Sequence, residues 1–300
     1  MIRQYLLLIR LPNAFTAPSN ILTGYLAVVL PSYADGSNLS ILMLSSALLY
    51  ISGIVFNDYF DIEVDRQERP FRPLASGKVT KQKAFTIAAA AMITANFLAF
   101  TVSTTSFIVA IILSVTVIGY DYRLKQTMAG PFIMGSARFL NIFLGASPAL
   151  AGLFFSNNNF LSLRLILVSM LMLLYVLAIS ILSRMEIGAT TRSKRAIIGP
   201  FIIIFAVVGS LVFARFVNIF HVDLVPSLVL FTGITAITFK RTLFQDYSST
   251  GIQKTIKTLV LSIIVLDSIF ASGTASIYYG LATLLLIIPS MALARKLYVT

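Results

Sequence analysis

Long apolar stretches separated by short polar segments fill the whole chain. Most of the stretches run for about 20 residues, the length at which a helix crosses the hydrocarbon core of a bilayer. The pattern predicts ten helices, at residues 4–30, 39–57, 82–102, 105–120, 130–153, 160–182, 196–217, 222–240, 256–272 and 276–294. We therefore expect an all-α membrane bundle of nine to ten spans, forming a single domain over residues 1–300.

The composition agrees with a multi-pass membrane protein. Hydrophobic residues make up 58% of the chain and charged residues 11%, and the mean hydropathy is +0.91. A soluble domain carries about 25% charged residues, so this chain has too little polar surface to face water. The absence of Cys excludes disulfides, thiolate metal sites and thiol nucleophiles. The presence of a single histidine, His221, argues against a histidine-based metal site or general base.

Basic residues gather on alternate loops. The loop near 31–38 and the turns near 103–105, 154–159 and 273–275 contain no Lys or Arg. Because Lys and Arg are retained on the cytoplasmic side, the N-terminus and the charged loops are predicted to be cytoplasmic, in the cell (inner) membrane. The C-terminus joins them if residues 267–276 form a turn, whereas nine spans would place it outside. The net charge of +12 then reflects membrane topology rather than nucleic-acid binding.

The scarce acids concentrate in one polar segment. Five of the 11 Asp and Glu residues fall within 11 consecutive positions, namely Asp58, Asp61, Glu63, Asp65 and Glu68. The spacing of Asp58, Asp61 and Asp65 puts three carboxylates on one face if the second helix continues this far. No Lys or Arg is interleaved, and Asn57 adds a neutral oxygen, so the set suits Mg²⁺. The alternative is a solvated loop whose acids pair with the arginines that follow.

The segment after the acids, "RPFRPLASGKVT" (69–80), is basic and contains two Arg-Pro pairs. Pro73 restricts Arg72 to an extended or turn conformation. An arginine offers a planar fork for phosphate oxygens. Carboxylates that hold Mg²⁺, beside arginines at a membrane surface, suit a diphosphate whose apolar tail lies among the helices.

The string "NDYFDIEVD" (57–65), followed by "RPLASGKVT" (72–80), resembles the first signature of the UbiA superfamily of intramembrane prenyltransferases. Three further segments resemble the same family in order along the first 150 residues, namely "RLPNAFTAPSNILTGY" (10–25), "YDYRLKQT" (120–127) and "GSARFLN" (135–141). The resemblance implies a bundle with a central cavity that opens near the cytoplasmic side. It also implies transfer from a prenyl diphosphate with Mg²⁺ as the cofactor.

The resemblance implies site residues outside the acidic segment. Asn13 and Asn20 in the first helix are expected to face the cavity. Tyr120 and Lys125 match the family's Tyr-x-x-x-x-Lys loop, with Lys125 expected to contact phosphate. The fifth helix carries two more candidates for ligand binding, Arg138 and Asn141.

The loop after the sixth helix departs from the family pattern. UbiA-type enzymes usually carry a second aspartate-rich motif there, whereas "SRMEIGATTRSKR" (183–195) has Glu186 as its only acid among several basic residues. Arg184 and its basic neighbours are expected to contact phosphate directly, and Glu186 is a candidate for a further metal ligand. The start of this loop and "VLDSIFASG" (265–273) resemble the divergent EboC-like branch, which is associated with bacterial secondary-metabolite clusters.

Three other charged residues allow two interpretations each. A charge inside a span is costly unless it meets a partner or water, so Arg138 either lines the cavity or extends to the cytoplasmic edge. Asp121 is interpreted as a loop charge rather than a partner of Lys125. Asp267 is either functional or an interfacial cap near the outer turn.

These features predict an integral membrane prenyltransferase that acts on a prenyl diphosphate and a small-molecule or lipid acceptor among membrane lipids, with no nucleic-acid partner. The residues expected to act in catalysis are Asp58, Asp61, Asp65, Arg72 and Lys125. The expected metal ligands are Asn57, Asp58, Asp61, Asp65 and Glu186. The bound metal and the basic residues would offset charge on the departing diphosphate, while an apolar cavity would keep water from the allylic cation. An acceptor near Asn13, Asn20 or Asn141 would then attack C1.

Two other functions fit the sequence less well. The first is a protein that binds an isoprenoid lipid or supports metabolite export without transfer chemistry. The missing second acidic motif favours this alternative. A secondary transporter would be expected to hold its site near the bilayer midplane, whereas these charges gather at the cytoplasmic edge. No motif selects the acceptor, the donor length or the oligomeric state.

Overall fold

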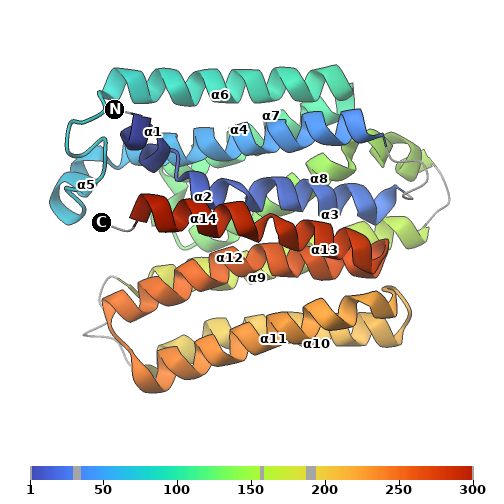
Figure 1. Ribbon diagram of the computed structural model, residues 1–300. Helices are drawn as coiled ribbons and strands as arrows, with labels where there is room; N and C mark the ends of the chain where they lie inside the picture. Colours follow the sequence, from blue (N-terminus) through green and yellow to red (C-terminus); the bar gives the residue numbers. More distant parts are fainter. Residues whose placement is uncertain (1, 30–34, 156–158, 187–193, 299–300) are drawn as a thin grey trace.

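The computed structural model describes residues 2–29, 35–155, 159–186 and 194–298. Within these ranges the chain is helical apart from short connections and contains no strand, which confirms the all-α prediction. The long helices are α4 (Gly36–Phe60), α6 (Lys81–Val102), α7 (Thr104–Tyr122), α8 (Gly130–Phe155), α9 (Asn159–Ser183), α10 (Ile198–Phe216), α11 (Val225–Lys240) and α12 (Ser249–Thr274). They run side by side along one direction (Figure 1).

Shorter elements complete the bundle. The short α-helices are α1 (Ile2–Leu8), α2 (Leu11–Ala14), α3 (Thr16–Val28), α5 (Ile62–Glu68), α13 (Ile277–Leu285) and α14 (Ile287–Tyr298). The 3-10 turns are η2 (Leu124–Gln126), η3 (Lys194–Ile197) and η4 (Val222–Leu224), and η5 (Arg241–Gln245) is a π-helical turn. Both α4 and α12 begin before their predicted starts, because the side chains of Asp35 and Ser248 accept backbone N–H groups of the first turn.

Eight helical segments in the described part of the chain are long and apolar enough to cross a membrane. They leave out α8 and the interrupted stretch from α1 to α3, although both run along the bundle (Figure 1). The multi-pass membrane prediction is confirmed, and the predicted count of nine to ten spans is not.

The first predicted helix is wrong as one continuous element, because it is divided into α1, α2 and α3. Arg10 adopts a left-handed backbone conformation with φ 45°, which ends the first segment. Pro12 then opens α2, where its missing N–H costs no helical hydrogen bond. These breaks bring the Arg10 side chain to the end of α4, where it meets a carboxylate.

Helix α3 lies inside the bundle, packed against α4, α8, α9 and α12. Two glycines bring α3 and α8 close together. A Cβ atom at Gly24 would overlap the carbonyl oxygen of Ile142, and one at Gly145 would overlap that of Ile21. Small residues permit such close approach of spanning helices. This approach places the polar side chains of α3 beside those of α8.

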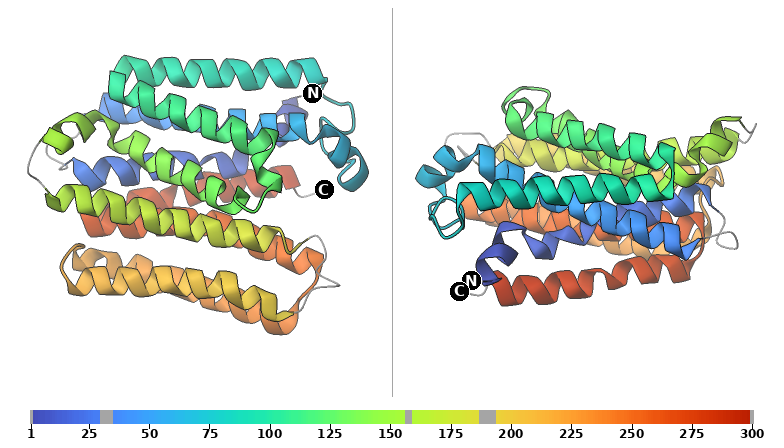
Figure 2. Two further views of the ribbon diagram at one scale, coloured as in Figure 1. Left: turned by 180° about the vertical axis from the view of Figure 1, so that it is seen from behind. Right: turned by 90° about the horizontal axis from the view of Figure 1, so that it is seen from above.

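Both ends of the described chain lie at the same end of the bundle, together with α5 (Figure 1). Residues 275–276 separate α12 from α13, which packs back along α12. The chain therefore turns here, as the predicted topology with both termini on the same side requires. The hairpin of α10 and α11 lies on one side against α9 and α12, and α6 lies on the other side against α4 and α7 (Figure 2).

Candidate functional site

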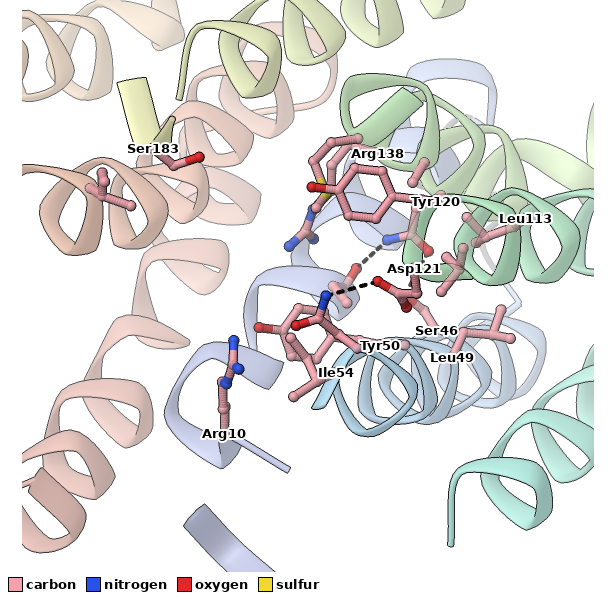
Figure 3. A pocket seen from close by; sticks show the side chains of 18 of the residues that line it. Arg10, Ser46, Leu49, Tyr50, Ile54, Leu113, Tyr120, Asp121, Arg138 and Ser183 are labelled. Atoms are coloured by element: carbon pink, nitrogen blue, oxygen red, sulfur yellow. Dashed lines mark hydrogen bonds between the residues drawn. The ribbon is translucent and has the colours of Figure 1, made fainter. Parts of the chain in front are cut away.

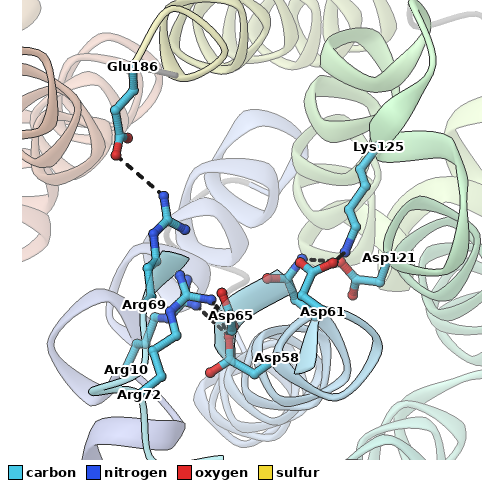
Figure 4. A network of polar contacts seen from close by, with 10 residues as sticks. Arg10, Asp58, Asp61, Asp65, Arg69, Arg72, Asp121, Lys125 and Glu186 are labelled. Carbon is cyan, nitrogen blue, oxygen red and sulfur yellow. Dashed lines mark hydrogen bonds and ion pairs between the residues drawn. The ribbon is translucent and has the colours of Figure 1, made fainter. Parts of the chain in front are cut away.

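A group of charged side chains, which we call the mouth cluster, lies at the end of the bundle that carries α5 (Figure 4). Its members are Arg10, Asp58, Asp61, Asp65, Arg72 and Lys125. Asp58, in the last turn of α4, is only 2% exposed. Its Oδ1 accepts hydrogen bonds from Nη2 of Arg10 at 2.6 Å and from Nη1 of Arg72 at 3.2 Å. The same Nη1 donates to Oδ2 of Asp65 at 2.5 Å.

Asp61 and Asn57 face other partners. Nζ of Lys125 lies 2.5 Å from Oδ1 of Asp61, and Nδ2 of Asn57 donates to Oδ1 of Asp121 at 3.1 Å. The three carboxylates predicted to share one face are therefore divided between two sets of partners, since Asp61 is paired with Lys125 and the other two share Arg72. Asp61 forms the junction of α4 and α5, with backbone angles φ −90° and ψ 6°, and its N–H still bonds to the carbonyl oxygen of Asn57.

The predicted alternative, in which the acids pair with the arginines that follow, describes part of this arrangement. Arg72 contacts both Asp58 and Asp65, although these acids are buried rather than solvated. The exposed acid Glu63 behaves as a surface residue and pairs with Arg66 three positions along α5. The segment thus contains an inward group of carboxylates and an outward ion pair.

The interpretation of Asp121 as a loop charge is wrong. This residue lies in the last turn of α7, is 3% exposed and lines the cavity. The apolar run of α7 continues to Tyr122, so the aspartate is carried inside the helix. Its amide partner, Asn57, reaches it from α4.

The second basic loop begins near this cluster, and residues 187–193 lie outside the described residues. Arg184 donates through Nη2 to the backbone carbonyl oxygens of Lys125 at 2.7 Å and Thr127 at 2.6 Å. It therefore fixes the turn that carries Lys125. Glu186 accepts from Nε2 of Gln253 at 2.6 Å and from Arg69 at 3.4 Å. Figure 4 shows Glu186 on the far side of Arg69 from the other carboxylates, so it is not a member of one ligand set with them.

A cavity of about 470 Å³ extends from this end into the bundle between α4, α7 and α8 (Figure 3). Six of the predicted site residues line it: Asn57, Arg72, Tyr120, Arg138, Asn141 and Glu186. Its deeper wall is mostly apolar and includes Leu49, Ile54, Leu113, Val117 and Met134. The cavity therefore joins a charged mouth to an apolar interior.

Neither Asn13 nor Asn20 lines the cavity, so the expectation that both face it is wrong. Asn20 is fully buried and belongs to a second polar group, which we call the deep cluster. Its members are Ser19, Asn20, Thr23, Arg138 and Asp267. Close packing of α3 against α8 and α12 explains its burial, because the side chains of α3 meet those helices before they reach the cavity.

Asp267 is not an interfacial cap, because it lies within α12 and is fully buried. Its carboxylate accepts hydrogen bonds from three neutral side chains of α3, namely Ser19, Asn20 and Thr23. Arg138 lines the cavity, which is the first of its two interpretations. It donates to Asn20 rather than extending to the edge of the bundle.

Two residues of the site were not expected from the sequence. Arg10 lines the mouth and pairs with Asp58, and Tyr50 lies under the guanidinium of Arg138 with 5.5 Å between its ring centre and Cζ. A basic residue directly before the Leu-Pro pair of a predicted span was the available signal for Arg10. Tyr50 gave no signal, since aromatic residues are common throughout the chain.

The chemistry of Asp58 and Asp65 suits a hard cation. Their oxygens converge on one positive group, Nη1 of Arg72. Mg²⁺ binds through one or two carboxylates and completes its shell with water and substrate phosphates. No group of three or more His, Cys, Asp or Glu side chains forms a metal site among the described residues. The fitting donor set is therefore this carboxylate pair, to which Asp61 and the amide oxygen of Asn57 would add from the neighbouring group of Lys125 and Asp121.

The fold and the site define a multi-pass membrane protein with a cavity that is charged at its mouth and apolar inside. The chain belongs to the UbiA prenyltransferase family, which it matches over residues 18–187. This assignment confirms the resemblance seen in the sequence, while the finer assignment to the EboC-like branch stays a prediction.

Curated relatives share a name. The digeranylgeranylglyceryl phosphate synthase of Saccharolobus solfataricus is 29% identical over 167 residues, which cover 55% of this chain and 56% of that protein. The synthase of the same name from Methanococcoides burtonii is 34% identical over 163 residues, covering 50% and 57%. The chain thus spans about half the length of the curated relatives it matches.

Solved structures of low sequence identity share the fold. A UbiA homolog from Aeropyrum pernix superposes with a TM-score of 0.70 at 14% identity, over 86% of this chain and 96% of that one. A UbiA homolog from Archaeoglobus fulgidus bound to GPP and Mg²⁺ gives a TM-score of 0.65 at 15% identity, over 93% and 99%. The similarity therefore extends to the C-terminal helices, beyond the part that the family match covers.

Proposed function

We propose that this chain is an integral membrane prenyltransferase, which transfers an isoprenyl group from a prenyl diphosphate to an acceptor. The observation that carries the proposal is the cavity, which joins a mouth lined by Arg10 and Arg72, the partners of Asp58 and Asp65, to an apolar interior. A diphosphate is highly charged and a prenyl chain is apolar, so one molecule of this kind matches both parts. Membership of the UbiA prenyltransferase family supports the same reaction.

The mouth cluster would bind the diphosphate. Asp58 and Asp65 would hold Mg²⁺, with Asn57 and Asp61 contributing from the other side, and the metal would offset charge on the diphosphate. The binding of Mg²⁺ and diphosphate to the archaeal homolog of similar fold supports this pairing of ligands. Arg72 and Lys125 already lie against these carboxylates and would contact phosphate oxygens as the leaving group gains charge.

The apolar wall would hold the prenyl tail and exclude water from the reacting carbon. During transfer the bond between C1 and the diphosphate oxygen breaks, and a bond forms between C1 and the nucleophilic atom of the acceptor. The acceptor releases its proton to water or a base. Of the three asparagines predicted near the acceptor, Asn141 is the candidate that lines the cavity.

The donor and acceptor to test first come from the relatives. Their name, digeranylgeranylglyceryl phosphate synthase, supports geranylgeranyl diphosphate as the donor and a geranylgeranylglyceryl phosphate lipid as the acceptor. A role in bacterial secondary metabolism, as in the EboC-like branch, would require another acceptor. The two cases differ in which acceptor allows release of pyrophosphate.

We also propose that the mouth cluster faces the cytoplasm. The excess of Lys and Arg on the loops at this end supports that orientation. The chain has no Cys, so a single Cys introduced at Ser76 reports the orientation directly. Labelling of Ser76→Cys by an impermeant maleimide in right-side-out vesicles would contradict it.

Turnover of the purified protein tests the proposed function. Wild type should release pyrophosphate from geranylgeranyl diphosphate and the glyceryl phosphate acceptor only when Mg²⁺ is present. Asp61→Ala should abolish this activity. Glu63→Gln should preserve it, since Glu63 belongs to the same acidic segment but faces solvent. Mg²⁺-dependent turnover by Asp61→Ala would show that the metal site is wrongly assigned.

One observation favours a second function. Glu186, the only acid of the second loop, is paired with Arg69 and Gln253 and leaves that loop without a free carboxylate pair. A protein that binds an isoprenoid lipid, or assists export of a metabolite, needs no leaving-group chemistry. It would bind the prenyl diphosphate without releasing pyrophosphate for any acceptor, so a single turnover would exclude it.

A further inference from the structure

Asp267 is a buried acid for which the proposed reaction has no direct use. It lies inside the membrane-spanning helix α12 and has no exposed surface. A buried carboxylate is costly unless it is well hydrogen-bonded. Here the hydroxyls of Ser19 and Thr23 and the amide of Asn20 donate to it, the last to both oxygens at 3.0 and 2.8 Å.

Asn20 links this carboxylate to the cavity. Its amide nitrogen faces Asp267, so its amide oxygen faces the other way and accepts from Nη1 of Arg138 at 3.1 Å. An ionised carboxylate can only accept hydrogen bonds, and an amide donates through one atom and accepts through the other. Asp267 therefore holds the nitrogen end of the Asn20 amide, while Arg138, and Asn141 at 3.5 Å, donate to its oxygen end.

Arg138 is held at a defined place in the cavity wall. In addition to Asn20, it donates to the carbonyl oxygen of Thr16 at 3.1 Å and to the hydroxyl of Thr16 at 3.0 Å. Its guanidinium lies over Tyr50, which precedes Asn57 on the same helix by seven residues, about 10 Å along the axis. Arg138 is thus a positive group one or two helical turns deeper than the mouth cluster.

We propose that Asp267 is a positioning residue, which orients Arg138 in the cavity through the amide of Asn20. The inference rests on the proposed function for what Arg138 then does, namely bind an anionic group of a substrate that enters the cavity. The geometric part of the inference stands on the three side chains alone. If Asp267 were only an attachment between α12 and α3, its loss would lower stability and leave Arg138 in place.

Substitutions that alter the link separate these roles. In Asp267→Asn a single neutral oxygen is left to accept from Ser19, Asn20 and Thr23, so the amide nitrogen of Asn20 is held less firmly. Asn20→Ala removes the link and leaves two donors on Asp267. Thr23→Val removes one of those donors and leaves the link, so it is the matched control.

The readout is the ¹⁵Nε–H nuclear magnetic resonance signal of Arg138, identified by its loss in Arg138→Lys. Asp267→Asn and Asn20→Ala should both shift this signal, and Thr23→Val should leave it unchanged. In the turnover assay the first two variants should raise the KM about tenfold with little change in kcat, as expected for loss of a charged hydrogen bond made equally before and during reaction.

An unchanged Arg138 signal in Asn20→Ala and Asp267→Asn would overturn the proposal, even if both variants unfold at lower temperature. Asn20→Ala decides the question alone if Asp267→Asn does not fold. Absence of turnover in wild type would instead contradict the proposed function, while the resonance shifts would still report whether Asp267 positions Arg138.

Discussion

The mouth cluster and the deep cluster both bring a carboxylate near an arginine, yet they are built in different ways. At the mouth, Asp58 contacts two guanidinium groups directly, and the side chains of Arg10 and Arg72 are 27% and 17% exposed. In the deep cluster, Asp267 has no exposed surface and contacts neutral donors, with Arg138 one residue further away.

The difference indicates which charges can exchange partners. A partly exposed arginine can leave its carboxylate when another cation takes its place there, because water or phosphate then replaces the contact of the guanidinium. A fully buried carboxylate cannot lose its donors without a large penalty. The mouth cluster is therefore suited to exchange its internal cations for Mg²⁺ and diphosphate, whereas the deep cluster is suited to hold a fixed geometry.

The largest effect is expected from Arg72→Gln. Removal of this guanidinium frees Asp58 and Asp65, so Mg²⁺ alone should bind more tightly. Geranylgeranyl diphosphate should bind about 100-fold more weakly, because hydrogen bonds between charged groups are strong where water is scarce. Calorimetric titration of each ligand separately measures the two changes. A parallel loss of affinity for both ligands would contradict the exchange.

Asp267→Ala should produce the next largest effect, on stability. It leaves three buried donors without their acceptor, and we expect a loss of about 3 kcal/mol in the free energy of unfolding. Asp58→Ala should cost less than this, because its arginine partners are partly exposed and Arg72 keeps its contact with Asp65. Reversible unfolding in mild detergent compares them. Equal losses would remove the distinction between the clusters.

Arg184→Ala should have a moderate effect on turnover. The side chain holds the carbonyl oxygens of Lys125 and Thr127, so its loss loosens the turn that presents Lys125 to Asp61. We expect kcat/KM to fall about tenfold, the effect of losing hydrogen bonds to a charged donor. If the two residues act together, Arg184→Ala should cost less activity in a chain that already carries Lys125→Ala than in the wild-type chain. An equal loss in both chains would contradict this.

The smallest effect is expected from Glu186→Gln. Glu186 accepts from Gln253 and Arg69 and lies apart from the other carboxylates, so the affinity for Mg²⁺ should stay within about twofold, as expected for a group remote from a ligand. Glu63→Gln serves as the exposed control. A tenfold loss of Mg²⁺ affinity in Glu186→Gln alone would restore it as a metal ligand.

The fold was largely predictable because apolar runs report the length of a spanning helix directly. The breaks between α1, α2 and α3 were harder to predict. Arg10 has its left-handed conformation in the tertiary structure, where its side chain contacts Asp58. Hydrophobicity likewise could not show that α7 continues far enough to include Asp121, because the position of a helix end depends on the turn that follows.

The site was predictable where its residues are neighbours in the sequence. Arg72 follows the acids closely, and its contact with Asp58 and Asp65 could be inferred from charge and spacing. The deep cluster joins Asn20 and Asp267, which are 247 positions apart, and no local pattern reports which helices pack together. Each of these residues alone is a polar group in an apolar run, so their link became evident only from the packing of α3 against α12.

The binding of geranylgeranyl diphosphate to the wild-type protein, titrated with and without Mg²⁺, tests the central claim most directly. The exchange of internal cations predicts that Mg²⁺ and the diphosphate each raise the affinity for the other by the same factor. It also predicts that Asp58→Asn removes this coupling. Equal affinity for the diphosphate in the presence of Mg²⁺ and of a chelator would contradict the account of the mouth cluster.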